Sequence, residues 1–281
     1  MNNTDIRSQY GLKYNPFLPD VPPEALFTIP GSERFTLRIQ TMANHGGFAL
    51  ITGDPGLGKS KTLQQIAHSL EQIPDLTVGV MQRPQSSLGD FYRELGELFN
   101  VGLSPANRYG GFKALRTRWK THCQSTLLRP VLLIDEAQQV STECLTELRL
   151  LQSHHFDSQN LLFTILCGDS RLPERFRTAD LLPLGSRIGP RLVLSPLSPE
   201  QLQDYLNFAL EKAGHPQLMS PELIRALAAH AANNLRVINH MAAELLTAAA
   251  ERNLPRIDES LFFELFSPEM SKPRRKPPGK Q

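Results

Sequence analysis

The chain has 281 residues, a formal net charge of +2 at pH 7 and 40% hydrophobic residues. A chain of this length can bury a substantial core, and it suggests one large domain or two unequal ones. Its nearly neutral charge does not by itself indicate a nucleic-acid-binding protein. The sequence has no signal peptide and no run of 18 apolar residues, so we expect a cytoplasmic protein with no membrane contact.

The charge is unevenly distributed along the chain. Five cations and no acid follow Glu269, which leaves a net charge of about −3 for the rest of the chain. These tail cations are Lys272, Arg274, Arg275, Lys276 and Lys280. The tail over residues 268–281 is rich in proline and too polar to fold alone. The three cysteines, Cys123, Cys144 and Cys167, have no metal-type spacing, which fits a reducing compartment.

The first predicted element is a helix that begins near Ser32 and continues to Met42, with Ser32 as its cap. The preceding stretch, Tyr10–Phe17, is aromatic and rich in turns, and the prolines that follow it exclude regular helix. Its aromatic residues fit two roles equally, packing in a core or contact with an adenine ring. We expect residues 1–45 to form a segment that approaches the next motif.

The central motif is a glycine-rich loop that follows the apolar run Phe48–Thr52 and precedes a helical apolar stripe from Thr62 to Leu70. The loop reads Gly53, Asp54, Pro55, Gly56, Leu57, Gly58, Lys59, Ser60. Strand, loop and helix in this order are the context of a phosphate-binding P-loop. Its backbone N–H groups bind phosphates, Lys59 reaches the β- and γ-phosphates, and the Ser60 hydroxyl binds Mg²⁺. The motif predicts ATP as ligand with Mg²⁺.

A second strand is predicted over Leu76–Met81 and a second helix over 88–99, followed by a loop over 102–111. The next helix has Phe112, Leu115 and Trp119 on its apolar side. It also carries four cations, Lys113, Arg116, Arg118 and Lys120. These cations could contact DNA phosphates, although a solvated helix face is the more common explanation of such a cluster.

The second strong signal is the apolar run Val131–Ile134, which ends in Asp135 and Glu136. Four apolar residues in a row are typical of a parallel strand that is covered on both faces. Carboxylates at the end of such a strand lie at the edge where α/β sheets place their chemistry. We expect Asp135 to hold Mg²⁺ and Glu136 to act as the general base that activates water beside the γ-phosphate.

A further strand over Leu161–Cys167 ends at the same edge, where Asp169 or Ser170 could sense the γ-phosphate. From Pro199 onward, four apolar stripes at helical spacing predict four short helices, with Gly214 ending the first. Four helices can form a small bundle that caps the nucleotide.

The order of Gly53–Ser60, Val131–Glu136, Arg187 and Asn234–Arg236 resembles that of an AAA+ ATPase. Tyr10–Phe17, the Ser186–Ile188 segment and the helix that begins at Leu235 resemble one subgroup of that family. This subgroup contains the ExeA-type ATPases and the TniB, TnsC and IstB helper ATPases of DDE transposases. The similarity extends over residues 10–265.

The resemblance implies an α/β fold, a P-loop three-layer core with a parallel sheet and a small C-terminal helical lid. It implies an ATPase core over residues 46–196 and a helical lid over 197–267. It implies that Arg187 is an arginine finger that reaches into a neighbouring subunit, with Arg191 as the alternative, and that Arg236 contacts the γ-phosphate from the lid. A surface salt bridge is the alternative role of each arginine. Lys61 departs from the Ser or Thr of many relatives, and it could affect phosphate contacts.

The resemblance also implies a function. We expect a Mg²⁺-dependent ATPase that binds duplex DNA, forms a ring or filament of identical subunits, and regulates target selection and activation of a DDE transposase. The alternative is an ExeA-like ATPase that assembles a secretion apparatus. A clamp or replication loader is a weaker third option.

Overall fold

The computed structural model describes residues 3–81, 87–103 and 107–266, so the predicted basic tail over 268–281 lies outside the described residues. Within the described residues the chain divides into two compact units. One consists of residues 22–196 and the other of residues 3–21 with 197–266. The predicted segment 1–45 is therefore divided between the two units.

The first unit is built on a five-stranded parallel sheet with the strand order β2-β3-β6-β1-β7. Its strands are β1 (Gly47–Thr52), β2 (Val78–Met81), β3 (Val131–Ile134), β6 (Phe163–Gly168) and β7 (Ile188–Val193). Every residue of β1, β3 and β6 is buried, as the apolar runs predict for strands covered on both faces. A separate antiparallel hairpin joins β4 (Ser153–His154) to β5 (Gln159–Asn160).

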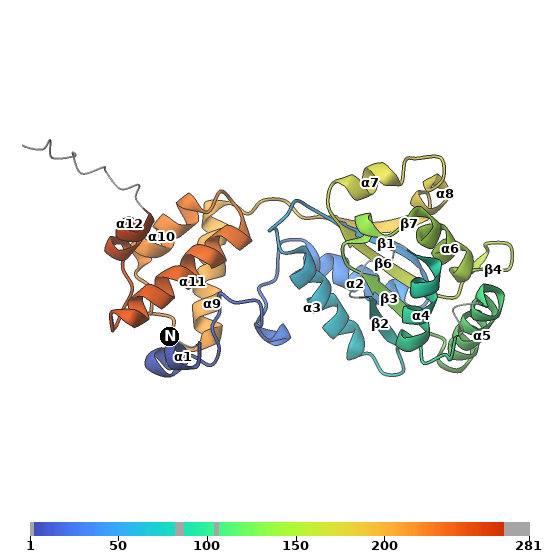
Figure 1. The fold of residues 1–281 in the computed structure, drawn as a ribbon, viewed down its shortest axis with the longest axis horizontal. Coiled ribbons are helices and arrows are strands. Elements are labelled where there is room, and N and C mark those ends of the chain that lie inside the picture. The colour runs from blue at the N-terminus through green and yellow to red at the C-terminus, as the bar shows by residue number, and fades with distance from the viewer. Residues whose placement is uncertain (1–2, 82–86, 104–106, 267–281) are drawn as a thin grey trace, which may run out of the picture. The chain divides into compact units, whose positions relative to one another are not determined.

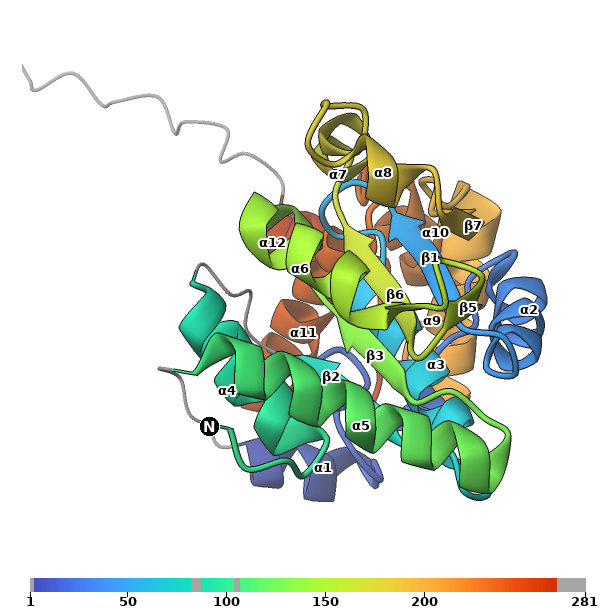
Figure 2. The ribbon, with the colours of Figure 1, turned by 90° about the vertical axis from the view of Figure 1, so that its right-hand side faces the viewer.

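Helices cover both faces of the sheet, which confirms the predicted α/β fold with a parallel sheet (Figure 1). On one face lie α2 (Ser32–Met42) and α3 (Lys59–Glu71). On the other lie α4 (Leu88–Leu98), α5 (Arg108–Thr126) and α6 (Thr142–Gln152), with α4 and α5 side by side in Figure 2. The short helices are η1 (Pro23–Ala25), η2 (Ala137–Gln139), α7 (Arg171–Arg175) and α8 (Leu182–Gly185).

Alternate residues of β1 pack against the two helical layers. Phe48 and Leu50 of β1 join the core cluster formed with α4, α5 and α6. Ala49 and Ile51 are equally buried and point to the opposite face, because successive strand residues alternate. The core therefore fixes which side chains at the end of each strand face the P-loop helix α3.

Polar residues cap several of the helices. Ser87, Asn107 and Ser141 each accept a hydrogen bond from a backbone N–H in the first turn of the following helix. The predicted cap of α2 is wrong, because Gly31 precedes this helix with φ 86° and the Ser32 hydroxyl donates to the Ile29 carbonyl oxygen. The loop predicted over 102–111 is shorter than expected, since α5 begins at Arg108.

The second unit is helical. Its elements are α1 (Asn3–Tyr10), α9 (Pro199–Ala213), α10 (Pro221–His230), α11 (Leu235–Glu251) and α12 (Glu259–Phe266). The four helices expected after Pro199 are thus present, and Gly214 ends α9 with φ 98°. None of the described helices has the length and apolar character needed to cross a membrane.

The N-terminal residues pack within this helical unit. The Tyr10 hydroxyl donates to the Leu254 carbonyl oxygen at 2.9 Å, and the backbone N–H of Lys13 donates to the Ala213 carbonyl oxygen at 2.9 Å. Ile6, Tyr10 and Leu12 are buried. Of the two roles considered for the aromatic stretch, Tyr10 takes the packing role.

Arg116 joins α5 to α6. Its guanidinium donates to the carbonyl oxygens of Leu150 at 3.0 Å, Leu151 at 2.8 Å and Ser153, all at the C-terminal end of α6. Burial lowers the pKa of this guanidinium below its ordinary value. A cation at a helix C-terminus satisfies carbonyls that have no partner within the helix. Arg116, expected on a DNA-binding face, therefore holds two helices of the core together.

We predict that Arg116→Ala lowers the free energy of unfolding by about 1.5–3 kcal/mol, because it removes charge-assisted hydrogen bonds to three carbonyl oxygens. Urea denaturation followed by circular dichroism measures this change. Arg118→Ala is the matched control, because Arg118 is exposed two residues along the same helix and should change stability by less than about 0.5 kcal/mol. Equal losses in the two variants would contradict this role of Arg116.

Candidate nucleotide-binding site

The glycine-rich loop connects β1 to α3, as predicted. Gly56 and Gly58 have φ angles of 86° and 91°, a left-handed conformation that favours glycine. Gly58 is the residue immediately before α3, and it has no side chain that could accept hydrogen bonds from the first N–H groups of the helix. These N–H groups and the helix N-terminus form a geometry that suits a polyphosphate.

The start of the loop is anchored to the segment after β7. The backbone N–H of Leu194 donates to the Thr52 carbonyl oxygen at 2.7 Å. A Cβ atom at Gly53 would lie 2.9 Å from the Leu194 carbonyl oxygen. Only glycine fits this position without displacing backbone, so the first glycine of the motif is required by packing.

Lys59 is buried beneath the loop that it would serve. It is 7% exposed, and its Nζ donates to the Asp54 carbonyl oxygen at 3.0 Å across the turn. Asp54 and Ser60 are exposed. The Lys61 amine donates to Gln64 Oε1 at 3.2 Å along α3, and Lys61 is half-buried.

The predicted acidic pair lies at the same edge of the sheet as the loop. In the register of the sheet, Ile134 of β3 pairs with Leu166 of β6, and Thr52 of β1 pairs with Gly168 of β6. Asp135 and Glu136 follow directly after Ile134, and both are half-buried. Parallel strands end at a common edge, which brings these carboxylates to the P-loop.

Cys167, near the end of β6, is influenced by the charged groups of the predicted site. Burial raises the pKa of its thiol, the charges of Asp135 and Glu136 raise it further, and the Lys59 ammonium opposes them. The thiol is completely buried. The charges of Lys59, Asp135 and Glu136 thus all act on this thiol, a neighbour of the predicted site that the sequence did not indicate.

The oxygen ligands at this edge fit Mg²⁺. The Ser60 hydroxyl and the Asp135 carboxylate are hard oxygen donors, the type that Mg²⁺ prefers. In the part of the chain that the structure describes, no three His, Cys, Asp or Glu residues form a metal cluster. Mg²⁺ usually binds through one or two protein oxygens together with substrate phosphates and water, so the donor set suits an ion that enters with the nucleotide.

Glu136 has a specific side-chain neighbour that sequence reasoning missed. Gln138 Nε2 donates to Glu136 Oε2 at 2.5 Å, and Gln138 Oε1 accepts from the backbone N–H of Asp169 at 3.3 Å. Glu136 itself has φ 49°, a conformation that is unusual for a residue other than glycine. The predicted base is therefore connected through one amide to the end of β6.

Of the two candidate sensors after β6, Asp169 is engaged by a neighbour. The Arg171 guanidinium donates to Asp169 Oδ2 at 2.5 Å and 2.9 Å, which lowers the pKa of the Asp169 carboxyl. Ser170 is exposed at the start of α7. Both positions lie at the edge where the sequence places them.

Arg187 forms an ion pair within its own chain. Its Nε donates to Asp157 Oδ2 at 2.9 Å, and its guanidinium also contacts the Pro183 carbonyl oxygen. This pairing lowers the pKa of the Asp157 carboxyl. Asp157 lies in the turn of the β4–β5 hairpin, where three consecutive residues have positive φ angles. The alternative, Arg191, is exposed on β7, and its guanidinium donates to the Gly185 carbonyl oxygen at 3.5 Å.

Arg236 is exposed in the first turn of α11, in the helical unit. Asn234 caps this helix, and its side chain accepts hydrogen bonds from the N–H groups of Arg236 at 2.9 Å and Val237 at 3.3 Å. The cap fixes the start of the helix on which Arg236 lies.

The four cations of α5 do not share one face. Helical spacing places Lys113, Arg116 and Lys120 on one stripe and Arg118 on the opposite side. Lys113 and Arg118 are exposed, whereas Lys120 is half-buried. The pKa of His154 is lowered, first by the burial of His154 itself and then by the positive charge of Lys120. Lys113, Arg118 and Lys120 therefore remain available to an anionic ligand, while Arg116 is engaged with α6.

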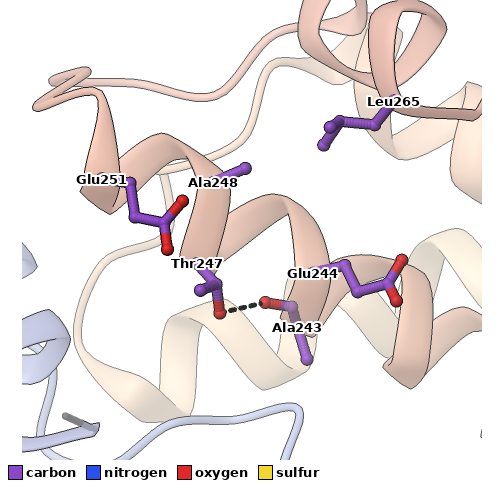
Figure 3. A pocket seen from close by; sticks show the side chains of 6 residues that line it. All are labelled: Ala243, Glu244, Thr247, Ala248, Glu251 and Leu265. Atoms are coloured by element: carbon purple, nitrogen blue, oxygen red, sulfur yellow. Dashed lines mark hydrogen bonds between the residues drawn. The ribbon is translucent and has the colours of Figure 1, made fainter. Parts of the chain in front are cut away.

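A shallow hollow lies on the helical unit between α11 and α12 (Figure 3). It is lined by Ala243, Glu244, Thr247, Ala248, Glu251 and Leu265. The Thr247 hydroxyl is engaged by the Ala243 carbonyl oxygen at 2.9 Å. Its two carboxylates would repel a polyphosphate, so this hollow does not suit a nucleotide phosphate group.

Comparison with known proteins supports the assignment of a nucleotide-binding site to the glycine-rich loop and the acidic strand end. Residues 42–176 match the AAA domain family. The chain is 30% identical over 217 residues to general secretion pathway protein A of Aeromonas hydrophila, covering 75% of this chain and 39% of that protein. It is 25% identical over 225 residues to the ATP-dependent target DNA activator B of Escherichia phage Mu, covering 78% of this chain and 65% of that protein. The chain thus spans less than two thirds of each relative.

Solved structures share the fold. The Aeropyrum pernix ORC2 protein, in ADPNP–ADP complexes, aligns with a TM-score of 0.70 at 16% identity, covering 89% of this chain and 70% of that one. Domain III of the replication initiation protein DnaA from Thermotoga maritima aligns with a TM-score of 0.60 at 20% identity, covering 89% and 96%. At these identities the likeness concerns the fold alone. The P-loop and the acidic strand end both lie within residues 42–176, the part of the chain that matches the AAA domain family, so the chain resembles the AAA+ ATPases in this region.

Proposed function

We propose that this chain is a Mg²⁺-dependent, DNA-binding ATPase that oligomerises on duplex DNA and regulates target selection and activation of a DDE transposase. The observation that carries the ATPase part is the glycine-rich loop between β1 and α3, with Asp135 and Glu136 after β3 at the same edge of the sheet. The DNA part draws support from the similarity to a protein named ATP-dependent target DNA activator. Lys113 and Lys120, which lie on one stripe of α5, supply positive charge for DNA binding.

In the proposed reaction, the loop N–H groups and Lys59 bind the phosphates of ATP. Lys59 then exchanges its bond to the Asp54 carbonyl oxygen for phosphate oxygens. Ser60 and Asp135 would hold Mg²⁺, and the ion would supply positive charge that neutralises developing phosphate charge. Glu136 accepts the proton of the attacking water. Arg187 or Arg191 of a neighbouring subunit, and Arg236 of the lid, would stabilise charge on the transferred phosphoryl group.

A secretion-related role is the second candidate function. It is favoured by the 30% identity to general secretion pathway protein A, a higher value than that for the phage activator. The matched region is, however, a smaller share of the secretion protein than of the activator. A measurement of binding to duplex DNA distinguishes the two functions, because only the transposition-related role requires such binding.

The first prediction concerns hydrolysis. Lys59→Ala should weaken ATP binding by at least about 10-fold, because hydrogen bonds to charged groups contribute about 1.5–3 kcal/mol. Glu136→Gln should bind ATP normally and lower turnover by about 10²- to 10⁴-fold, since an amide cannot accept the proton of water. Calorimetry and phosphate release measure the two effects. Glu143→Gln, the same change at an exposed carboxylate of α6, should be silent. Normal turnover in Glu136→Gln would refute the assigned base.

The second prediction concerns the arginine finger. Arg187→Ala should bind ATP and lose about 10³-fold or more of its hydrolysis rate, and mixing with Glu136→Gln subunits should restore part of it. Asp157→Ala frees Arg187 and should raise the rate by up to about 5-fold, because an exposed ion pair contributes about 0.2–1 kcal/mol. Asp180→Ala, at an exposed aspartate, is the matched control. If Arg191→Ala alone loses activity, Arg191 is the finger.

The third prediction concerns DNA. Anisotropy should detect duplex binding only with ATP, because alignment of subunits would join their weak basic surfaces. The affinity should fall by about 0.9 logarithmic units per contacted phosphate for each decade of salt. Lys113→Gln/Lys120→Gln should reduce that slope by about 2, whereas Arg225→Gln/Arg252→Gln in the helical unit should not. Binding that is equal with and without ATP and insensitive to salt, or no binding at all, would favour the secretion-related role.

A further inference from the structure

Gln138 links two parts of the nucleotide site that are distant in the sequence. It belongs to the short helix η2, directly after the acidic pair, and it is half-buried. One end of its amide donates to the Glu136 carboxylate, and the other accepts from the backbone N–H of Asp169, 31 residues away. Both hydrogen-bonding ends of the amide are therefore used.

The orientation of this amide is determined by its two partners. A backbone N–H can only donate, so the group that faces Asp169 must be the amide oxygen. The NH₂ group then faces Glu136, whose ionised carboxylate only accepts. The reversed orientation would place donor against donor and oxygen against carboxylate. The Glu136 carboxylate thus accepts from the Gln138 NH₂ group, and the Asp169 N–H at the end of β6 determines the direction of that NH₂ group.

The surroundings leave Gln138 little freedom. Arg175 NH1 donates to its backbone carbonyl oxygen at 2.6 Å, which holds the main chain of η2 against α7. A Cβ atom at Gly168 would collide with Gln138 Oε1, so the amide occupies space that is open only because this residue is glycine. The left-handed conformation of Glu136 directs the chain into η2 and toward this contact.

We propose that Gln138 is a positioning residue that aligns the Glu136 carboxylate and couples it to the end of β6, where Asp169 and Ser170 lie beside the nucleotide. The proposal rests on the proposed ATPase function and adds a means of regulation to it. A displacement of the Asp169 backbone moves the amide, and the amide moves the carboxylate. Glu136 is then aligned for its water only when the β6 end is in place.

The test uses the full chain with Gln138→Glu and Gln138→Ala. Gln138→Glu keeps the length of the side chain and an oxygen for the Asp169 N–H, but it removes the donor to Glu136. Gln138→Ala removes both contacts. We expect kcat to fall by about 10- to 100-fold in both, because small misplacements of a reacting group cost up to about 10²-fold. KM for ATP and the ATP affinity measured by calorimetry should stay within about 2-fold of the wild type. The midpoint temperature of thermal unfolding should stay within a few degrees of the wild type.

Gln139→Ala is the matched control, since Gln139 is the exposed neighbour of Gln138 in the same short helix. Wild-type kcat in Gln138→Glu would overturn the proposal, as would a loss of kcat that is matched by lost ATP affinity or by Gln139→Ala. The variant Glu136→Gln distinguishes failure of the positioning role of Gln138 from failure of the proposed ATPase function. If the wild type and Glu136→Gln hydrolyse ATP equally, the base is wrong. If only Glu136→Gln is inactive and Gln138→Glu is normal, the base stands and the positioning role falls.

Discussion

The site depends on the close approach of two backbones at Gly53. The Leu194 carbonyl oxygen occupies the space that a side chain at this position would need, and the Leu194 N–H binds the end of β1. This contact fixes the point at which the glycine-rich loop leaves the sheet. Because β1 lies between β6 and β7, the loop begins at an interior strand, one strand from the edge strand β7. The carboxylates after β3 and the Asp169 N–H after β6 lie at the same edge of the sheet, on the two strands next in order beyond β1.

The local features of this arrangement could be predicted from the sequence. The eight-residue loop, the strand before Asp135 and the four late helices each depend on residues that are adjacent or at regular spacing, so periodicity and turn chemistry were sufficient. The sheet and its helical layers followed from these elements. The cap at Ser32 was wrong because a glycine with positive φ competes for the same role.

The remaining features depend on contacts between residues that are remote in the chain. Arg116 reaches carbonyl groups more than 30 residues away, and Arg187 reaches Asp157 across 30 positions. A sequence shows the charge of such residues but not the partner that the fold places beside them. Gln138 is a further case, because an uncharged amide four residues beyond a strand end gives no signal until β6 is placed beside it.

Trp119 gives this protein a built-in optical reporter. It is the only tryptophan among the 281 residues, and it is buried with its ring at 81° to that of Phe99, 5.3 Å between centroids. Its fluorescence emission therefore reports on the interior of the α/β unit, from the helix α5 that also carries Lys113 and Lys120. The helical unit contains no tryptophan, since the single one lies elsewhere. Melting of the α/β core can thus be followed separately from melting of the helical unit, without an added label.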